Sequence, residues 1–203
     1  EAGRLAEEIA PVVVGEGKKT VRVERDEHPR PGTTVEALAK LPTVFGPDSF
    51  VTGGNASGIV DGACMLLLTT AGRAAELGHR PIGRLLSWSV VGVEPSRMGI
   101  GPAPAIRAAL DKAGLKLAEL DLLEINEAFA GQIVAVVREM KLDEERLNVN
   151  GGAIALGHPL GASGARLTLT LLKELRRRGG GRGVASACIG GGQGIALIVE
   201  AIP

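Results

Sequence analysis

The 203-residue chain contains no tyrosine, only 2% aromatic residues, two cysteines and no net excess of charge. The scarcity of aromatic rings argues against the stacking surfaces that bind nucleic-acid bases. Because 23 basic residues balance 23 acidic ones, no overall field attracts nucleic acid or an anionic membrane. Two cysteines without CxxC spacing argue against a disulfide framework or a zinc site, so we expect no metal.

Long apolar segments are also missing. No run approaches the roughly 20 residues that a helix needs to span a bilayer, so we expect no membrane span. The N-terminus lacks the basic and then apolar pattern of a signal peptide, but an internal start would make this uninformative. With 45% hydrophobic and 23% charged residues, the composition is ordinary for a packed globular chain. We expect a cytoplasmic protein, or an organellar one in a eukaryote.

Glycine, in contrast, is abundant, with 30 residues. Two glycine-rich blocks, Asn148–Arg166 and Ser186–Gly194, contain one of the three histidines, His158, and one of the two cysteines, Cys188. Turns with little side-chain bulk let a reactive group face a substrate while backbone N–H groups lie close to it. An imidazole and a thiol held in this way suggest acyl-transfer chemistry.

The amino-acid sequences of these blocks closely resemble those of the thiolases, the 3-ketoacyl-CoA and acetoacetyl-CoA acyltransferases. Asn126–Ala130 (NEAFA) and Gly54–Gly58 (GNASG) add two further blocks, and the resemblance runs from Gly3 to Val199. Long matches at four separated sites are far more specific than one short motif. The resemblance is strongest to the 3-ketoacyl-CoA thiolases of fatty-acid oxidation, through His28–Pro31, Met98–Pro102 and Cys188–Gly194.

One departure from the family is large. A complete thiolase is about twice as long, and its nucleophilic cysteine lies in the first half. Neither Cys64 nor Cys188 lies in a sequence like that of the nucleophile. We therefore expect the C-terminal half of a thiolase, either a fragment or one part of a split enzyme, with the first half as its partner. Homodimers or homotetramers are the default assemblies of such a protein.

The family resemblance divides the expected chain into three parts. Residues 1–55 would belong to the CoA-binding loop region, 56–80 to the end of the N-terminal thiolase domain, and 81–203 to the C-terminal domain. The fold it implies is an α/β fold of αβαβα layers, built from two similar halves.

Hydrophobic spacing and turn residues independently predict an α/β sheet covered by helices, with an antiparallel ending. Thr33 or Thr34 would cap the first helix, Pro42 would end it, and Gly114 would end a later one. The expected helices span 33–41, 56–70, 104–113, 129–140 and 162–178, and the expected strands span 12–14, 21–23, 81–93, 120–125, 147–150, 183–188 and 194–202.

The resemblance also implies catalytic roles. His158 would activate the nucleophilic cysteine and contribute to an oxyanion hole, although an isolated histidine is at least as often structural. Cys188 would act as acid and base, whereas without its context it would be a small buried hydrophobe. Asn126 would hold a water that binds the thioester oxygen, with a helix cap or turn as its alternative. Gly190 would offer a backbone N–H near the acyl group, and Glu127 could orient its neighbours.

Contacts to CoA follow from the same resemblance. Arg30 and Ser57 match positions near the nucleotide and pantetheine, and a solvated loop cation is an equal alternative for Arg30. Phe45 and Met98 match positions along the pantetheine and acyl path, and Phe129 would lie at the pocket edge. Among the remaining candidates, we expect surface positions for His28 and His79 and a core position for Cys64.

Together these features predict a thiolase-type acyltransferase that cleaves 3-ketoacyl-CoA with CoA or condenses two acyl-CoA molecules. CoA would be a substrate, and no cofactor is expected. The chain alone should be inactive, because it has no residue to form the acyl-thioester intermediate. The alternative is a non-catalytic thiolase-like subunit that binds CoA thioesters or scaffolds a partner.

Overall fold

The computed structural model describes residues 3–202. Short 3-10 turns lie at Ala6–Glu8, Gly17–Lys19, Pro95–Ile100, Leu117–Glu119 and Glu144–Arg146. The strands are β1 (Val12–Val14), β2 (Val21–Val23), β3 (Gly83–Gly92), β4 (Leu122–Ile125), β5 (Gly181–Ile189) and β6 (Gln193–Ala201). The α-helices are α1 (Val35–Leu38), α2 (Ala71–Glu76), α3 (Pro102–Ala113), α4 (Ala130–Met140), α5 (Ala153–Leu156) and α6 (Ser163–Arg177).

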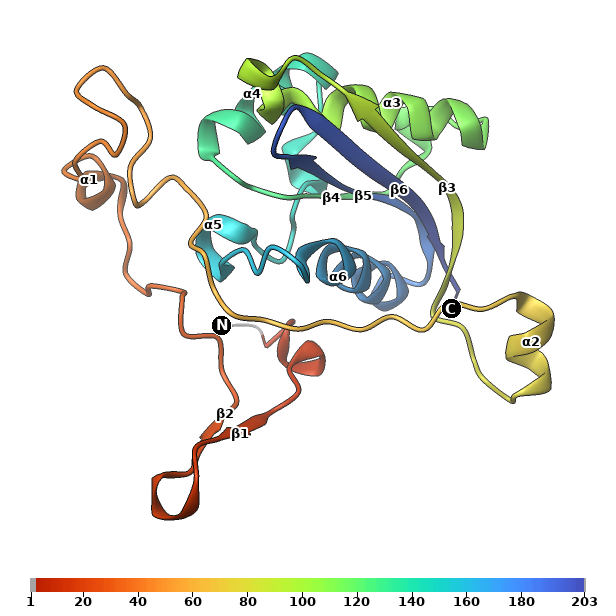
Figure 1. Ribbon diagram of the computed structural model, residues 1–203. Coiled ribbons are helices and arrows are strands. Elements are labelled where there is room, and N and C mark those ends of the chain that lie inside the picture. The colour runs from red at the N-terminus through yellow and green to blue at the C-terminus, as the bar shows by residue number, and fades with distance from the viewer. Residues whose placement is uncertain (1–2, 203) are drawn as a thin grey trace.

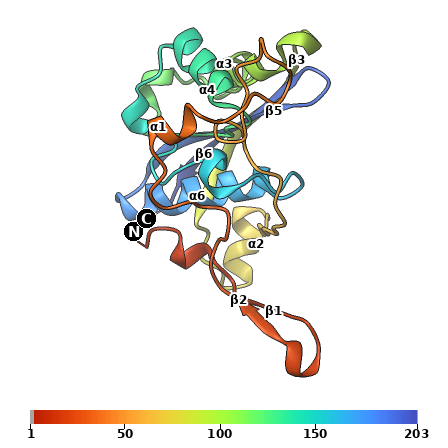
Figure 2. The same ribbon diagram turned by 90° about the vertical axis from the view of Figure 1, so that its left-hand side faces the viewer.

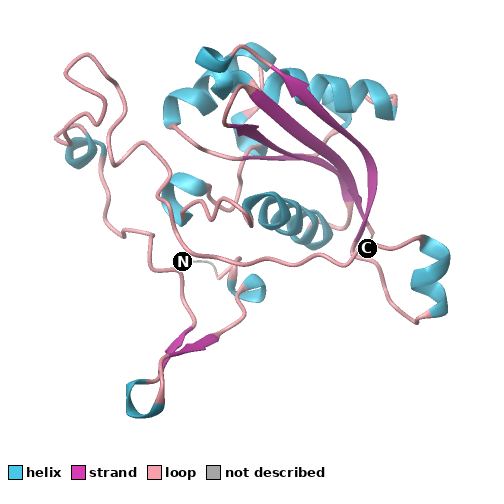
Figure 3. Ribbon diagram, in the orientation of Figure 1, coloured by secondary structure: helices cyan, strands magenta, loops and turns pink. Residues whose placement is uncertain are grey.

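A four-stranded sheet in the order β3-β6-β5-β4 forms the centre of the molecule. β4 and β5 are parallel, whereas β6 runs antiparallel to both β5 and β3. Helices α3 and α4 cover one face, and α6 lies on the other (Figures 1 and 3). The predicted α/β sheet with an antiparallel ending is therefore confirmed.

The larger core lies between the sheet and the α3–α4 layer. Ile106 and Leu110 of α3 are buried there, and each fully buried aliphatic side chain of this size contributes roughly 1.5–3 kcal/mol. Ser87 and Ser89 of β3 donate hydrogen bonds of 2.6 Å to backbone carbonyls of α3, which fix the helix against the strand. Gly114 ends α3 in the left-handed conformation, with φ of 66°, as its position predicted.

The smaller core lies between the sheet and α6. Leu167, Leu171 and Leu175 recur every four residues along α6, and all three are buried. This spacing places them on one face of the helix. The sequence therefore located α6 correctly, and α3 and α4 also begin and end within two residues of their predicted bounds.

The helix predicted over 56–70 was wrong. Most of this segment is extended and lies outside any regular element, and the helix that follows, α2, begins only after Thr70 caps it by accepting from the Arg73 amide. A nearly continuous apolar run fits any periodicity, so spacing does not distinguish helix from extended chain there. Gly58 and Gly62 further disfavour a helix. The segment passes along α6 (Figure 1) and exposes 91% of Met65.

The strand predicted over 147–150 was also wrong. Leu147 makes one isolated bridge to Leu123, and Asn148 has a positive φ of 47°. The Asn148 amide replaces further strand pairing, because its Oδ1 accepts from the Ile125 N–H at 2.8 Å and its Nδ2 donates to the Ile125 carbonyl at 2.9 Å. The short helix α5, absent from the sequence prediction, follows this turn.

The first 55 residues contain little regular structure. The β1–β2 hairpin was predicted correctly, and it projects away from the sheet (Figure 2). Helix α1 is shorter than predicted, with only four residues, and Thr34 caps it by accepting from the Ala37 amide at 3.2 Å.

Candidate active site

The carboxyl ends of the parallel strands β4 and β5 meet at one edge of the sheet. Asn126 follows β4, and its N–H donates to the Ser186 carbonyl of β5 at 2.9 Å. Cys188 lies two residues further along β5, opposite Gly194 of β6. The amide and the thiol singled out in the sequence therefore lie on neighbouring strands at the same edge.

His158 reaches this edge from the loop between α5 and α6. Its backbone N–H donates to the Gly58 carbonyl at 2.8 Å, and its Nε2 lies 3.4 Å from Asn126 Nδ2. The preceding Gly157 has a φ of 93°, and a Cβ there would lie 2.6 Å from the side chain of Val60. Only glycine therefore fits the turn that presents the imidazole.

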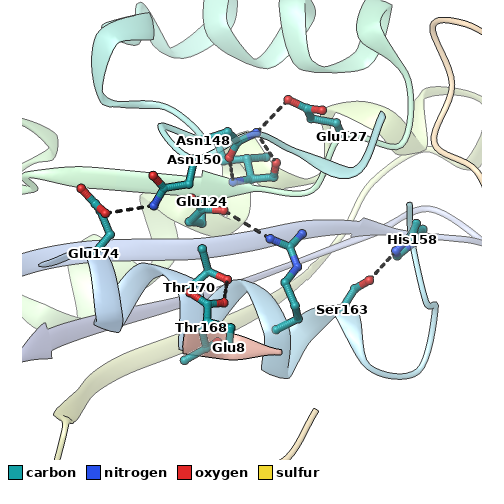
Figure 4. A network of polar contacts seen from close by, with 12 residues as sticks. Glu8, Glu124, Glu127, Asn148, Asn150, His158, Ser163, Thr168, Thr170 and Glu174 are labelled. Atoms are coloured by element: carbon teal, nitrogen blue, oxygen red, sulfur yellow. Dashed lines mark hydrogen bonds and ion pairs between the residues drawn. The ribbon is translucent and has the colours of Figure 1, made fainter. Parts of the chain in front are cut away.

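Ser163 determines which nitrogen of the His158 ring carries a proton. The Ser163 hydroxyl lies 2.6 Å from His158 Nδ1 (Figure 4) and donates to the Pro159 carbonyl at 3.1 Å. A hydroxyl has one proton to donate, so it accepts from Nδ1–H. Nε2 is then left with its lone pair on the side of Asn126.

Two effects favour the neutral form of His158. Burial lowers the pKa of the imidazole, because the charged form loses hydration, and the positive charge of Arg166 lowers it further. A neutral ring with a free lone pair on Nε2 can accept a proton at neutral pH. The arrangement therefore suits a general base.

Asn126 is 1% exposed, and its Oδ1 has no hydrogen-bond partner among the described residues. It is not a helix cap, because α4 begins at Ala130 and Phe129 occupies the cap position. A buried polar atom without a partner is uncommon and calls for a functional explanation. The Asn126 amide oxygen can therefore accept a hydrogen bond from a bound molecule beside the His158 ring.

The Glu127 carboxylate links the turn after β4 to two later segments that precede the His158 loop. Its carboxylate accepts from Asn148 Nδ2 at 3.1 Å and from the Ile154 amide at 3.2 Å. The first contact holds the turn after β4 to Asn148 (Figure 4), and the second holds it to the start of α5, just before the His158 loop. Gly152 lies directly against this carboxylate and leaves no room for a side chain.

Cys188 is half-buried, and burial raises the pKa of its thiol. Gly190 is exposed in the tight turn that follows, where Gly191 and Gly192 have φ of 86° and 90°. The Gly192 carbonyl accepts from the Val93 amide at 2.7 Å, which anchors this turn to the end of β3.

Two predictions about other reactive side chains need correction. Cys64 is not in a core, because it lies half-buried in the extended segment, where burial also raises the pKa of its thiol. His28 is half-buried rather than on the surface, and its imidazole packs directly against Gly58. Since the Gly58 carbonyl accepts from His158, His28 supports the same site. His79 is exposed as expected.

The candidate CoA contacts lie in different environments. Ser57 and Phe129 lie beside the turn after β4: Ser57 donates to the Ala128 carbonyl through both its N–H and its hydroxyl, and Phe129 follows that turn. Met98 is half-buried in the turn before α3. Arg30 is exposed, and Phe45 is 71% exposed in the loop after α1.

The part of the chain that the structure describes contains neither a metal-binding cluster nor a membrane-spanning helix. Residues 3–202 hold no cluster of three histidine, cysteine or acidic side chains placed to bind a metal. Within the same residues, no helix combines the length and apolarity that crossing a membrane requires.

Comparison with known proteins gives consistent matches. The family model described as "Thiolase, C-terminal domain" matches residues 79–201, and the one described as "Thiolase, N-terminal domain" matches residues 1–72. The human mitochondrial 3-ketoacyl-CoA thiolase is 54% identical over 98% of this chain. The chain spans 50% of that relative, so it covers about half the length of the curated proteins it matches.

Solved structures agree with the fold. The acetyl-CoA acetyltransferase of Bacillus anthracis is 50% identical with a TM-score of 0.96, over 99% of this chain and 51% of that one. The human mitochondrial 3-ketoacyl-CoA thiolase in complex with CoA is 50% identical with a TM-score of 0.89, over 99% of this chain and 50% of that one. The expected α/β, thiolase-like fold is confirmed.

Proposed function

The chain belongs to the thiolase family, and from this premise we propose that it supplies His158, Asn126 and Cys188 to an acyltransferase site. The reaction is cleavage of a 3-ketoacyl-CoA by CoA, or the reverse condensation of two acyl-CoA molecules. The observation that carries this proposal is the contact between His158 Nε2 and Asn126 Nδ2, 3.4 Å apart, at the sheet edge that Cys188 shares.

In this proposal His158 activates a nucleophilic thiol that the first half of a complete thiolase provides. Nε2 accepts the thiol proton, and the thiolate attacks the C3 carbonyl carbon of the 3-ketoacyl-CoA. The carbonyl electron pair moves to oxygen, and backbone N–H groups such as that of Gly190 stabilise this oxyanion, while the imidazolium Nε2–H and a water held by Asn126 bind the thioester oxygen. Removing one such donor costs roughly 100- to 1000-fold in rate.

Collapse of the tetrahedral adduct then breaks the C2–C3 bond. The bonding pair leaves on C2 as the enolate of an acyl-CoA, and Cys188 donates its proton to that carbon. A raised thiol pKa suits this step, because the thiol keeps its proton at neutral pH until the carbanion needs it. The Cys188 thiolate next takes the proton of an incoming CoA thiol, and the CoA sulfur attacks the acyl-enzyme carbonyl. The thioester bond to the nucleophilic sulfur breaks, the shorter acyl-CoA leaves, and the nucleophilic thiolate takes its proton back from the His158 imidazolium.

The remaining contacts serve the CoA thioester, which is the substrate, and no cofactor takes part. Residues 1–55 belong to the CoA-binding loop region, with Arg30, Phe45 and Ser57 as contacts. Residues 56–80 end the N-terminal domain and 81–203 form the C-terminal domain, with Met98, Phe129 and the Gly190 N–H near the acyl group. A relative that was solved in complex with CoA supports CoA as the molecule that these residues contact. Relatives named as mitochondrial support an organellar location in a eukaryote, and elsewhere we propose a cytoplasmic one.

The first half of a thiolase is the proposed partner. A groove of about 1030 Å³ lies between the 65–71 segment, α6 and the β3–β6 side of the sheet. Its lining includes Leu67, 80% exposed, and Leu85, 41% exposed. An apolar surface of this kind favours coverage by another polypeptide.

Reconstitution tests the proposal. The purified chain alone should not cleave acetoacetyl-CoA, whereas mixing it with the separately produced first half of the human relative should restore thiolysis. His158→Ala in the mixture should lower the rate at least about 100-fold. Activity of the chain alone would refute the need for a partner nucleophile. A mixture that co-sediments and binds CoA without cleaving substrate would instead establish the non-catalytic alternative.

A further inference from the structure

A single side chain, that of Asn148, bonds the residues on both sides of Asn126. Its Oδ1 accepts from the Ile125 N–H at 2.8 Å, and its Nδ2 donates to the Ile125 carbonyl at 2.9 Å. The same Nδ2 donates to Glu127 Oε1 at 3.1 Å (Figure 4). No step of the proposed reaction uses Asn148, so its contacts call for another explanation.

The contacts compensate for the position of β4 at the end of the sheet. β4 pairs with β5 on one side only, so the backbone groups of its other edge need partners from outside the sheet. The Asn148 N–H donates to the Leu123 carbonyl at 2.9 Å, and the Asn148 side chain continues this pairing at Ile125. On the inner edge, the Asn126 N–H donates to the Ser186 carbonyl at 2.9 Å. The backbone that carries Asn126 is thereby held from both edges of β4.

Close packing does not set the position of this turn on the side of α4. A cavity of about 340 Å³ lies there, between Asn148 and Glu127 and the side chains of Ile133 and Val137. Glu127 is also bonded by the Ile154 amide, which donates to Oε2 at 3.2 Å. Hydrogen bonds therefore hold the turn after β4, and the Asn148 side chain makes three of them.

The backbone of Asn148 adopts a conformation that few side chains accept. Its φ is 47°, and in residues 3–202 only Lys141, with φ of 55°, is another residue besides glycine with a positive value. Asparagine is among the residues that tolerate this region. Glycine tolerates it better but has no side chain to bond β4, so the backbone conformation alone does not account for asparagine at this position.

We propose that Asn148 is a positioning residue of the site. By bonding both neighbours of Asn126 it fixes the backbone between them, and it thereby places the Asn126 amide against His158. Asn126 Nδ2 lies 3.4 Å from His158 Nε2, and a misplacement of about 1 Å in such a group can cost about 100-fold in rate. The inference rests on the proposed roles of Asn126 and His158, and it adds a residue that acts only through the backbone of its partners.

Two variants of Asn148 and one control test this role. Asn148→Gly suits the positive φ but removes the side chain. Asn148→Asp keeps the volume and the acceptor for the Ile125 N–H, but it replaces the donor with an oxygen that faces the Ile125 carbonyl and the Glu127 carboxylate. Lys141→Gly is the matched control, because it makes the same change at the other positive φ, just after the end of α4.

Kinetics in the mixture with the first half measure the effect on the reaction. In both Asn148 variants kcat for acetoacetyl-CoA should fall roughly 10- to 100-fold, with KM close to that of the parent, because the contacts to CoA are unchanged. Lys141→Gly should cleave at the parent rate. Parent rates in both Asn148 variants would overturn the proposal, and so would an equal loss in Lys141→Gly or an effect on KM alone.

Hydrogen exchange in the 203-residue chain, followed by mass spectrometry, tests the same role without activity. The Ile125 amide has Asn148 Oδ1 as its acceptor, so in Asn148→Gly it should exchange faster than in the parent chain, and the neighbouring Asn126 amide should follow. Unchanged exchange at both amides would overturn the proposal. A mixture in which even the parent chain fails to cleave substrate would instead refute the proposed reaction, and the exchange at these two amides would still decide whether Asn148 holds the turn.

Discussion

At the scale of single residues, the Ser163 hydroxyl controls which nitrogen of the His158 ring can act as a base. It lies between Nδ1 and the Pro159 carbonyl, and it therefore sets both the tautomer and the ring orientation. Nothing in the residues 157–159 around His158 specifies this partner, which comes from the first turn of the next helix.

Ser163→Ala should slow acylation in the reconstituted enzyme. A hydrogen bond of this kind is worth about 0.5–1.5 kcal/mol, which corresponds to roughly a 2- to 12-fold loss of rate. Pre-steady-state release of the first product measures it, and Ser163→Thr, which keeps the hydroxyl, should recover most of the rate. Equal rates for Ser163→Ala and the parent enzyme would show that packing alone orients the ring.

Cys188→Ser separates the two halves of the reaction. A hydroxyl is a far weaker acid than a thiol, so proton transfer to and from the substrate carbon should be slow while acylation by the first acyl-CoA proceeds. Quenched samples should contain acyl-enzyme that condenses poorly with a second acyl-CoA. Normal condensation would refute the acid/base role of Cys188 and show that its side chain only packs against its neighbours.

At the scale of elements, stability depends on the two apolar layers that flank the sheet. Leu171 of α6 is fully buried in the smaller layer, and Leu171→Ala should lower the free energy of unfolding by roughly 2–5 kcal/mol. Val134→Ala on α4, where the side chain is 44% exposed, is the matched control and should cost within about 0.5 kcal/mol. Urea unfolding followed by circular dichroism measures both, and similar losses would contradict this picture of the core.

The elements with one buried face were the ones that the sequence predicted well. In α3, α4 and α6 the apolar residues recur at helical spacing because each helix packs against the same sheet. The apolar run in 63–68 gave a misleading signal, because its side chains do not pack into this chain's core. The strand expected at 147–150 failed for another reason: the Asn148 side chain makes the bonds that a strand backbone would make.

The candidate site was predictable only where its residues lie in local motifs. The glycine-rich blocks marked His158 and Cys188, and the NEAFA block marked Asn126. The contacts of Glu127 to the start of α5, and of Arg166 to Glu124, join residues more than 20 positions apart. No local spacing encodes such pairs, so they emerged only from the folded chain.

At the scale of the whole molecule, the exposed apolar side chains should drive association. Ile59, Met65 and Leu68 expose 87%, 91% and 72% of their surface, and contiguous apolar patches beyond a few hundred Å² are rare on monomers. At micromolar concentration the chain should sediment with a bound first half or as a self-associated species, with dimers or tetramers as the default. Met65→Lys combined with Leu67→Glu should shift it towards monomer.

A monomer that binds no apolar dye would contradict this expectation. It would identify the chain as an independent domain and favour the non-catalytic alternative. The surface variant Arg73→Lys, which changes an exposed side chain of α2 without altering its charge, controls for effects of mutation itself.

The contact of Val60 with Gly157 has an evolutionary consequence. These residues come from the extended segment and the His158 loop, nearly a hundred positions apart, yet the Val60 side chain occupies the space that a Cβ at residue 157 would need. The φ of 93° already requires glycine at 157, so the contact constrains position 60 instead: a residue larger than valine there should displace the turn that presents His158. A chimera of two relatives that crosses over between the two positions should keep its imidazole in place only when the residue brought in at 60 is no larger than valine.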